Sequence, residues 1–218
     1  MAGIVKVDDR VIDKPGTQIR DTARVEVSGP KEPFVSRAGR KLAAALDHFE
    51  LDPSGLVCLD VGASTGGFTD CLLQHGAACV FAVDVGYGQL AWKLRQDRRV
   101  VVFERTNIRS LRPDMLEPAP DFAVIDASFV SLKGLLPPVM KLLPAQGCIL
   151  ALVKPQFEVG PGGVESGGIV RDERRYQEVF KTLISTVRSL GMHVAGILES
   201  PITGHKGNRE FFIYLRLS

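Results

Sequence analysis

From Ser36 onward, short apolar runs alternate with segments in which apolar residues recur at helical spacing. A strand, a helix and a second strand of the same sheet form a right-handed parallel crossover. Repetition of that unit predicts an α/β, Rossmann-like fold, with a mostly parallel sheet of seven strands and helices on both faces. No helix separates the last two apolar runs, so we expect one antiparallel strand near the C-terminus. The expected strands are residues 56–61, 79–85, 99–104, 121–127, 147–154, 193–200 and 209–217.

Residues 1–28 have a different pattern, in which short β-like runs are separated by turn residues. Two or three short strands bury little apolar surface, so we expect part of an ancillary module here. Residues 29–35 contain two prolines, which disfavour regular structure, and predict a linker. Residues 36–218 then form the main domain. Its helices are expected at residues 36–51, 66–76, 89–97, 132–143 and 173–191.

The composition argues against several classes of protein. No apolar run approaches the ~20 residues that span a bilayer, and the N-terminus carries charges where a signal peptide is apolar. We therefore expect a cytoplasmic protein without membrane insertion. The four cysteines form no CxxC pair and the four histidines show no zinc spacing, so no metal site is expected. A net charge of +2 does not by itself indicate a nucleic-acid-binding protein.

The sequence LDVGASTGGF, residues 59–68, joins the first strand of the main domain to the next helix. Ligands of parallel sheets bind at the carboxyl ends of the strands, where this turn lies. Its glycines allow a ligand to approach the backbone closely, or they are ordinary turn residues. The turn matches neither GxGxxG nor the P-loop pattern. The cofactor-binding residues predicted here are Asp60, Gly62, Ser64, Thr65, Gly66, Gly67 and Phe68.

Polar residues at strand ends indicate the chemistry of the ligand. Asp60 is unsuited to a diphosphate but suits a ligand that carries an ammonium group. Asp84 ends the next strand, where an acidic residue typically binds the ribose hydroxyls of an adenosine, although a strand-end cap is the alternative. Asn107 and Ile108 follow the third strand and are expected either at the adenine ring or in a solvated loop. Together these features favour S-adenosylmethionine over NAD.

Four charged residues occupy positions at which chemistry is expected. Asp126 ends the strand DFAVIDA and is also a candidate cofactor contact, while Lys154 ends the strand ILALVK. A lysine that closes an apolar strand is costly to bury unless it is paired, and adjacent strand ends would bring these two residues together. Lys41 lies on the first helix and Glu210 opens the last strand, and each of these alone is more often a surface charge.

The motifs VSRAGRKL, LDVGASTGGFTDCLL, VIDASFVS, LVKPQFE and GNREFF resemble, in this order, those of the TlyA-type methyltransferases. That family is related to the FtsJ-type RNA ribose 2′-O-methyltransferases, and some members carry a historical hemolysin label. The resemblance implies a class I methyltransferase fold and S-adenosylmethionine as cofactor. It also implies methyl transfer to cytidine 2′-hydroxyls of ribosomal RNA, with ribosomal RNA or ribosomal subunits as partners. The family's Lys–Asp–Lys–Glu tetrad corresponds to Lys41, Asp126, Lys154 and Glu210.

These residue types suit such a reaction. A ribose hydroxyl is a weak nucleophile near neutral pH, and we expect Lys154 to accept its proton or to stabilise the forming alkoxide. Lys41 is then the second cation, while Asp126 and Glu210 orient the two ammonium groups. Alignment of the hydroxyl oxygen with the methyl group supplies much of the remaining rate acceleration.

Residues 1–28 resemble the second half of the small RNA-binding domain found in the same family, and we expect its helical first half to be missing. The glycine-rich segment 156–172 is expected to be a lid or a disordered loop. Four basic residues are predicted to contact RNA, namely Arg37, Arg40, Lys206 and Arg209. Small-molecule methyl transfer, membrane lysis and RNA binding without catalysis stay open as alternatives, and so does the oligomeric state.

Overall fold

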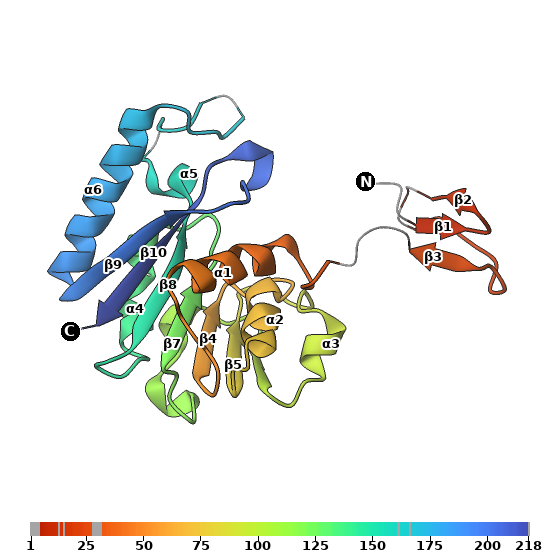
Figure 1. Cartoon of the computed structure of the whole chain (residues 1–218), viewed down its shortest axis with the longest axis horizontal. Coiled ribbons are helices and arrows are strands. Elements are labelled where there is room, and N and C mark those ends of the chain that lie inside the picture. The colour runs from red at the N-terminus through yellow and green to blue at the C-terminus, as the bar shows by residue number, and fades with distance from the viewer. Residues whose placement is uncertain are drawn as a thin grey trace. The chain divides into compact units, whose positions relative to one another are not determined.

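A computed structural model describes residues 5–12, 14, 16–27, 32–160, 162–165 and 167–217 (Figure 1). The chain divides into two compact units, Met1–Pro33 and Phe34–Ser218. The linker predicted for residues 29–35 crosses this boundary, and residues 29–31 lie outside the described part of the chain.

The first unit contains a small antiparallel sheet. Its strands are β1 (Val5–Val7), β2 (Arg10–Val11) and β3 (Val25–Val27). β1 lies in the centre and pairs with both neighbours. The valines of β3 are exposed, as expected for a sheet this small, which has little interior.

The second unit is built on a seven-stranded sheet in the order β6-β5-β4-β7-β8-β10-β9. The first five strands in this order are parallel, and β10 is antiparallel to both of its neighbours. The prediction of a mostly parallel seven-stranded sheet with one antiparallel strand is therefore confirmed. The strands are β4 (Val57–Val61), β5 (Cys79–Val83), β6 (Val100–Phe103), β7 (Phe122–Ile125), β8 (Cys148–Val153), β9 (Met192–Glu199) and β10 (Phe211–Leu217).

Helices cover both faces of this sheet. Leu42 and Leu72, from two helices on one face, pack in a core with Val80. Leu136 and Leu183, from two helices on the other face, pack in a second core that contains the strand side chains of opposite parity. Period-two alternation along each strand divides its apolar residues between the two cores. The helices are α1 (Arg37–His48), α2 (Gly67–Gln74), α3 (Trp92–Arg95), α4 (Leu136–Met140), α5 (Pro155–Glu158) and α6 (Glu173–Ser189).

Two predicted helices are shorter than expected. The segment 89–97 contains only α3, which has four residues. The segment 132–143 is divided into a 3₁₀ turn, Leu132–Gly134, and α4. Prolines stand in the first turn of α4, where their missing N–H groups cost nothing, so this helix begins only at Leu136. α5 was not predicted and begins with a proline in the same way.

The register of the sheet aligns four strand ends. Val61 of β4 pairs with Ile125 of β7, and Ile125 pairs with Ala151 of β8. Val153 of β8 pairs with Phe211, the first residue of β10. The parallel strands therefore end where β10 begins, and we call this side of the sheet its carboxyl edge. The functional residues described below follow or precede these strand ends.

Glycines allow α1 and α2 to pack closely. A Cβ atom at position 39 would overlap the Phe34 ring and would lie 2.8 Å from the carbonyl oxygen of Gly67. A Cβ atom at position 67 would overlap the Ser36 hydroxyl. The close approach of the two helices fixes the position of α1 on the sheet, and α1 carries Lys41.

The contact predicts that Gly39→Ala destabilises the second unit by about 1–2 kcal/mol, because overpacking outweighs the gain in helix propensity. Denaturant unfolding measures the change. Gly160→Ala is a matched control, since a Cβ there would meet no atom within 4 Å. A Gly39→Ala variant as stable as the unaltered protein would contradict this account of the helix contact.

Candidate active site

Two lysine–carboxylate pairs lie at the carboxyl edge of the sheet. The Lys154 Nζ atom lies 2.6 Å from Asp126 Oδ1, and it donates a hydrogen bond of 2.9 Å to the Ser128 hydroxyl. The Lys41 Nζ atom donates to Glu210 Oε2 at 2.5 Å. Asp126 follows β7, Lys154 follows β8 and Glu210 precedes β10, so adjacent strands deliver three of the four groups.

Burial makes the second pair strongly interdependent. Lys41 is 9% exposed and Glu210 is 3% exposed. Lys41 lies on the same helical turn as Leu42 and Ala45, which are in the core on that face of the sheet. Removing one partner would leave an uncompensated charge at low solvent access. Such a loss typically lowers the stability of the folded protein by several kcal/mol.

Two adjoining cavities flank the Lys154–Asp126 pair. The smaller cavity, of ≈ 160 Å³, is lined by the turn after β4 and reaches Lys154. The larger cavity, of ≈ 590 Å³, extends past the ends of β4, β5 and β7. They share four lining residues, namely Gly62, Ser64, Asp126 and Ser128. The combined space suits a ligand of the size of a nucleoside with a side chain.

Most predicted cofactor residues line this space. Thr65, Gly67 and Phe68 line the smaller cavity, while Asp84, Asn107 and Ile108 line the larger one. Gly62, Ser64 and Asp126 line both. Asp60 and Gly66 line neither of them.

Asp84 fixes the turn at the end of β4. Its Oδ2 atom accepts the Ser64 N–H at 2.8 Å, and its Oδ1 atom accepts the Gly86 N–H at 2.6 Å. Ser64 has a φ of 49°, which is uncommon for a residue with a Cβ atom. The carboxylate thus stabilises a strained turn while it lines the larger cavity, so it has a structural role beside any ligand contact.

Asp60 is buried beneath the turn. It is fully buried, and its Oδ2 atom accepts a hydrogen bond of 2.6 Å from Thr69. Its Oδ1 atom accepts no hydrogen bond from the described residues. Burial raises the pKa of Asp60 to about 7, and the negative charge of Asp126 contributes in the same direction. Because its strand neighbours Leu59 and Val61 face the other core, Asp60 faces α2, not either cavity.

The predicted RNA contacts differ in their surroundings. Arg37 and Arg40 are exposed on the first turns of α1. Lys206 is exposed and donates to the carbonyl oxygen of Gly167. The guanidinium of Arg209 pairs with the carboxylates of Glu199 and Glu173. Arg209 is thus engaged within the protein, and its contact with RNA stays a prediction.

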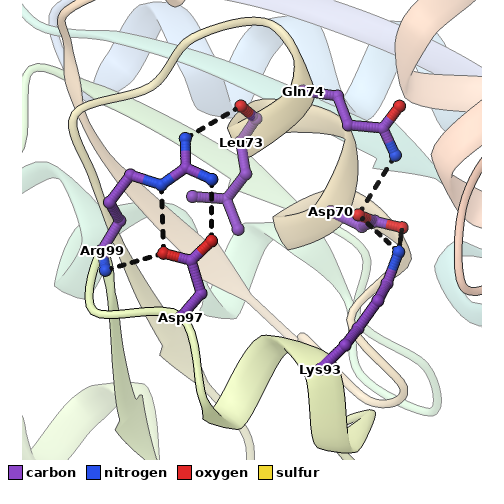
Figure 2. A network of polar contacts seen from close by, with 6 residues as sticks. All are labelled: Asp70, Leu73, Gln74, Lys93, Asp97 and Arg99. Atoms are coloured by element: carbon purple, nitrogen blue, oxygen red, sulfur yellow. Dashed lines mark hydrogen bonds and ion pairs between the residues drawn. The ribbon is translucent and has the colours of Figure 1, made fainter.

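A further basic group, at residues 93–99, is largely neutralised by nearby carboxylates. Figure 2 shows Lys93 bound to Asp70, and Arg99 bound to both oxygens of Asp97. Asp70 also accepts the Val35 N–H at 2.8 Å, so it joins the start of the second unit to α2 and α3.

One aromatic residue at the site was not predicted. Phe129 is 89% exposed, has a φ of 65° and lines the larger cavity. Its ring centroid lies 5.0 Å from that of Phe157. The residue belongs to the motif VIDASFVS, but sequence periodicity gives no sign that this ring projects into solvent. Ser128 beside it, which binds Lys154, was missed as well.

Within the described residues, no group of three or more histidine, cysteine, aspartate or glutamate side chains is arranged to hold a metal ion. None of the described helices has the length and apolar character needed to cross a membrane.

Comparison with known proteins adds independent information. Residues 34–217 match the model of the FtsJ-like methyltransferase family. The 16S/23S rRNA (cytidine-2′-O)-methyltransferase TlyA of Mycobacterium tuberculosis is 46% identical over 216 residues, which are 99% of this chain and 81% of that protein. A solved structure from Streptococcus thermophilus, labelled a hemolysin, is 45% identical with a TM-score of 0.86, covering 100% of this chain and 80% of the other.

A more distant likeness concerns the fold alone. An S-adenosylmethionine-dependent methyltransferase of Listeria monocytogenes superposes with a TM-score of 0.61 at 15% identity. The match covers 82% of this chain and 99% of that one. The mostly parallel sheet with helices on both faces is therefore shared well beyond close relatives.

The buried carboxyl of Asp60 predicts a pH dependence of stability. Its pKa is about 7 in the folded protein against an ordinary 3.8, so the folded state holds the proton more tightly than the unfolded chain. This group therefore lowers the free energy of unfolding as the pH rises from about 4 to about 7, by up to a few kcal/mol. Asp60→Asn keeps an acceptor for Thr69 and removes the titration.

We expect the stability of Asp60→Asn relative to the unaltered protein to increase steadily over that pH range. Urea unfolding at a series of pH values measures it. Parallel stability curves for the two proteins would contradict the assignment of the shift to Asp60.

Proposed function

Because the chain belongs to the FtsJ-like methyltransferase family, we propose that it transfers a methyl group from S-adenosylmethionine to the ribose 2′-hydroxyl of cytidines in ribosomal RNA. The observation that carries the proposal is the pair of buried or partly buried lysine–carboxylate contacts at the carboxyl edge, beside a cavity of nucleoside size. The name of the M. tuberculosis relative supports the choice of base and RNA. A protein with this activity works where ribosomal RNA is, in the cytoplasm.

The larger cavity has the surfaces that the cofactor requires. Val61, Val83 and Ile108 give it an apolar wall for a purine ring. Asp84 and Asn107 add a carboxylate and an amide that suit ribose hydroxyls and adenine nitrogens. When bound, S-adenosylmethionine supplies an electrophilic methyl group on a positively charged sulfur.

Lys154 is the group proposed to handle the proton of the ribose hydroxyl. Asp126 and Ser128 hold its Nζ atom at the wall of the smaller cavity, which fixes where the amine can act. A fixed amine at this place can take the hydroxyl proton or stabilise the alkoxide as the new C–O bond forms. Asp126 then balances the charge on Lys154 when the proton arrives.

The Lys41–Glu210 pair is proposed to tune this arrangement electrostatically. Glu210 precedes Phe211, whose strand partner is Val153, so Glu210 lies at the strand end next to Lys154. Lys41 gives the site a second ammonium group, and Glu210 holds that group in place at 2.5 Å. The four residues together carry no net formal charge, which limits the cost of burying them.

On the substrate side, exposed groups surround the pair. The ring of Phe129 projects beside Asp126 and Ser128 and offers a face on which an unstacked base can lie. Arg37 is exposed at the start of α1 and suits phosphate contact. We propose that the target nucleotide enters between these groups.

The main test follows a labelled methyl group from S-adenosylmethionine into ribosomal RNA. We expect incorporation at a cytidine 2′-oxygen with the unaltered protein, and loss of about 100-fold or more for Lys154→Ala and Asp126→Ala. Label in a small molecule instead of RNA would favour small-molecule methyl transfer. RNA binding with no transfer would leave a binding protein, and red-cell lysis without transfer would leave a lytic one.

Lys154→Arg tests which lysine moves the proton. Arginine keeps the positive charge beside Asp126 but does not release its proton in proteins. We expect turnover to fall by about 100-fold or more, while the Kd of the cofactor changes by less than about threefold. Near-normal turnover, with its usual pH profile, would rule out Lys154 as the base.

Phe129→Ala tests the stacking surface. The ring is exposed, so we expect little change in thermal stability, but kcat/KM for RNA should fall by about tenfold, as for the loss of one stacked base. Phe129→Tyr serves as the control and should retain most activity. Unchanged kcat/KM in Phe129→Ala would contradict a role in holding the base.

A further inference from the structure

Asn208 fastens the glycine-rich loop that follows Lys154. We call residues 159–172 the glycine-rich loop, and of these residues 161 and 166 lie outside the described part. Asn208 is 4% exposed. Its Oδ1 atom accepts the Val170 N–H at 3.2 Å, and its Nδ2 atom donates to the carbonyl oxygen of Gly168 at 3.0 Å. One buried side chain therefore binds the backbone of the loop at two points.

Arg209, the next residue, binds the end of β9 and the start of α6. Its Nε and Nη2 atoms donate to the two oxygens of Glu199, at 2.8 and 2.7 Å. Glu199 is the last residue of β9. A third nitrogen pairs with Glu173, the first residue of α6, and the guanidinium lies over the Tyr176 ring at 5.0 Å. A bidentate pair of this kind fixes direction as well as distance.

Glu210 follows directly, and its carboxylate lies close against Gly204. A Cβ atom at position 204 would overlap the Glu210 carboxylate. The Gly204 N–H donates to the carbonyl oxygen of Asn208 at 2.7 Å, which closes the segment 204–208 on itself. The oxygen of Glu210 that does not face Gly204 accepts from Lys41. Three consecutive residues thus make three sets of contacts. Asn208 binds the glycine-rich loop, Arg209 binds β9 and α6, and Glu210 binds Lys41.

The loop needs such an anchor for an entropic reason. It contains several glycines, and Gly162, Gly167 and Gly168 have positive φ values. Glycine loses more conformational freedom on ordering than any other residue, so few contacts decide whether the loop is ordered. Tyr176 adds one, since its hydroxyl donates to the carbonyl oxygen of Val170 at 2.6 Å.

We propose that Asn208 and Arg209 are positioning residues, which couple the order of the glycine-rich loop to the placement of the Lys41–Glu210 pair. The loop begins shortly after Lys154, and Asn208 and Arg209 directly precede Glu210. Ordering of the loop through these two residues therefore also fixes the position of Glu210. The two residues touch neither cavity beside Lys154 and Asp126. The activity arm of the test rests on the proposed methyl transfer, while its exchange arm is independent of it.

The test compares Asn208→Asp and Arg209→Lys with the unaltered protein by hydrogen exchange and by steady-state kinetics. Asn208→Asp keeps the acceptor for Val170 but sets an oxygen against the carbonyl of Gly168. Arg209→Lys keeps the charge but loses the bidentate pair. We expect faster exchange confined to the loop and to residues 204–210. We also expect kcat to fall by about tenfold while KM for the cofactor stays within about twofold.

Thr186→Ala is the control, because its hydroxyl is exposed and bonds only within α6 among the contacts described. It should change neither exchange nor kinetics. Faster loop exchange with unchanged kcat would overturn the coupling, and so would a loss of kcat with unchanged loop exchange. If the unaltered protein transfers no methyl group, the proposed function fails, while exchange that rises in the loop but not in residues 204–210 overturns this inference separately.

Discussion

The placement of one buried and one partly buried lysine at the same edge of the sheet is the constraint on which the rest of the site depends. Each ammonium group needs a carboxylate within direct contact, because unpaired charge at low solvent access is strongly unfavourable. Asp126 reaches Lys154 from the neighbouring parallel strand. Glu210 reaches Lys41 only because β10 is antiparallel, since a parallel strand would begin at the opposite edge. The single reversal of strand direction is thus what supplies the fourth charge.

Packing between the helices places the remaining lysine. Lys41 reaches the edge because α1 lies close against α2, and their glycines permit that approach. Asp70 strengthens the same junction by accepting the Val35 N–H and the Lys93 ammonium group, as Figure 2 shows in part. The position of Lys41 in the site therefore depends on apolar and polar contacts on the face of the sheet that α1 and α2 cover.

Sequence reasoning predicted the sheet and the strand-end residues well, because period-two apolar runs and their polar ends are local signals. Asp126 and Lys154 were placed together for that reason, and the structure brings them to 2.6 Å. The partners of Arg209 were not predictable in this way, since Glu173 lies far from it in sequence. The exposure of Phe129 depends on a left-handed backbone conformation, which no apolar pattern reveals.

Asp60 could have been assigned differently from the sequence alone. Its neighbours Leu59 and Val61 are apolar, and alternation along β4 places all side chains of the other parity, Asp60 among them, under α2. The strand end suggests a ligand contact because the carboxyl ends of strands face ligands. Asp126 follows β7 and lines both cavities, whereas Asp60 lies within β4 and its side chain points toward α2.

The glycine turn after β4 shows how packing and function combine. A Cβ atom at Gly62 would lie 2.5 Å from the carbonyl oxygen of Asp126, and one at Gly66 would overlap Leu94. Gly62 is therefore required by the protein's own backbone contacts, and Gly66 by its φ of 95°, before any ligand is considered. The requirement at Gly62 still serves the site, because it lets the ends of β4 and β7 approach and holds Asp126 against the cavity wall. A motif that sequence reasoning assigned to the cofactor thus acts first by setting the distance between two strands, and the chemistry follows from the residue that this distance positions.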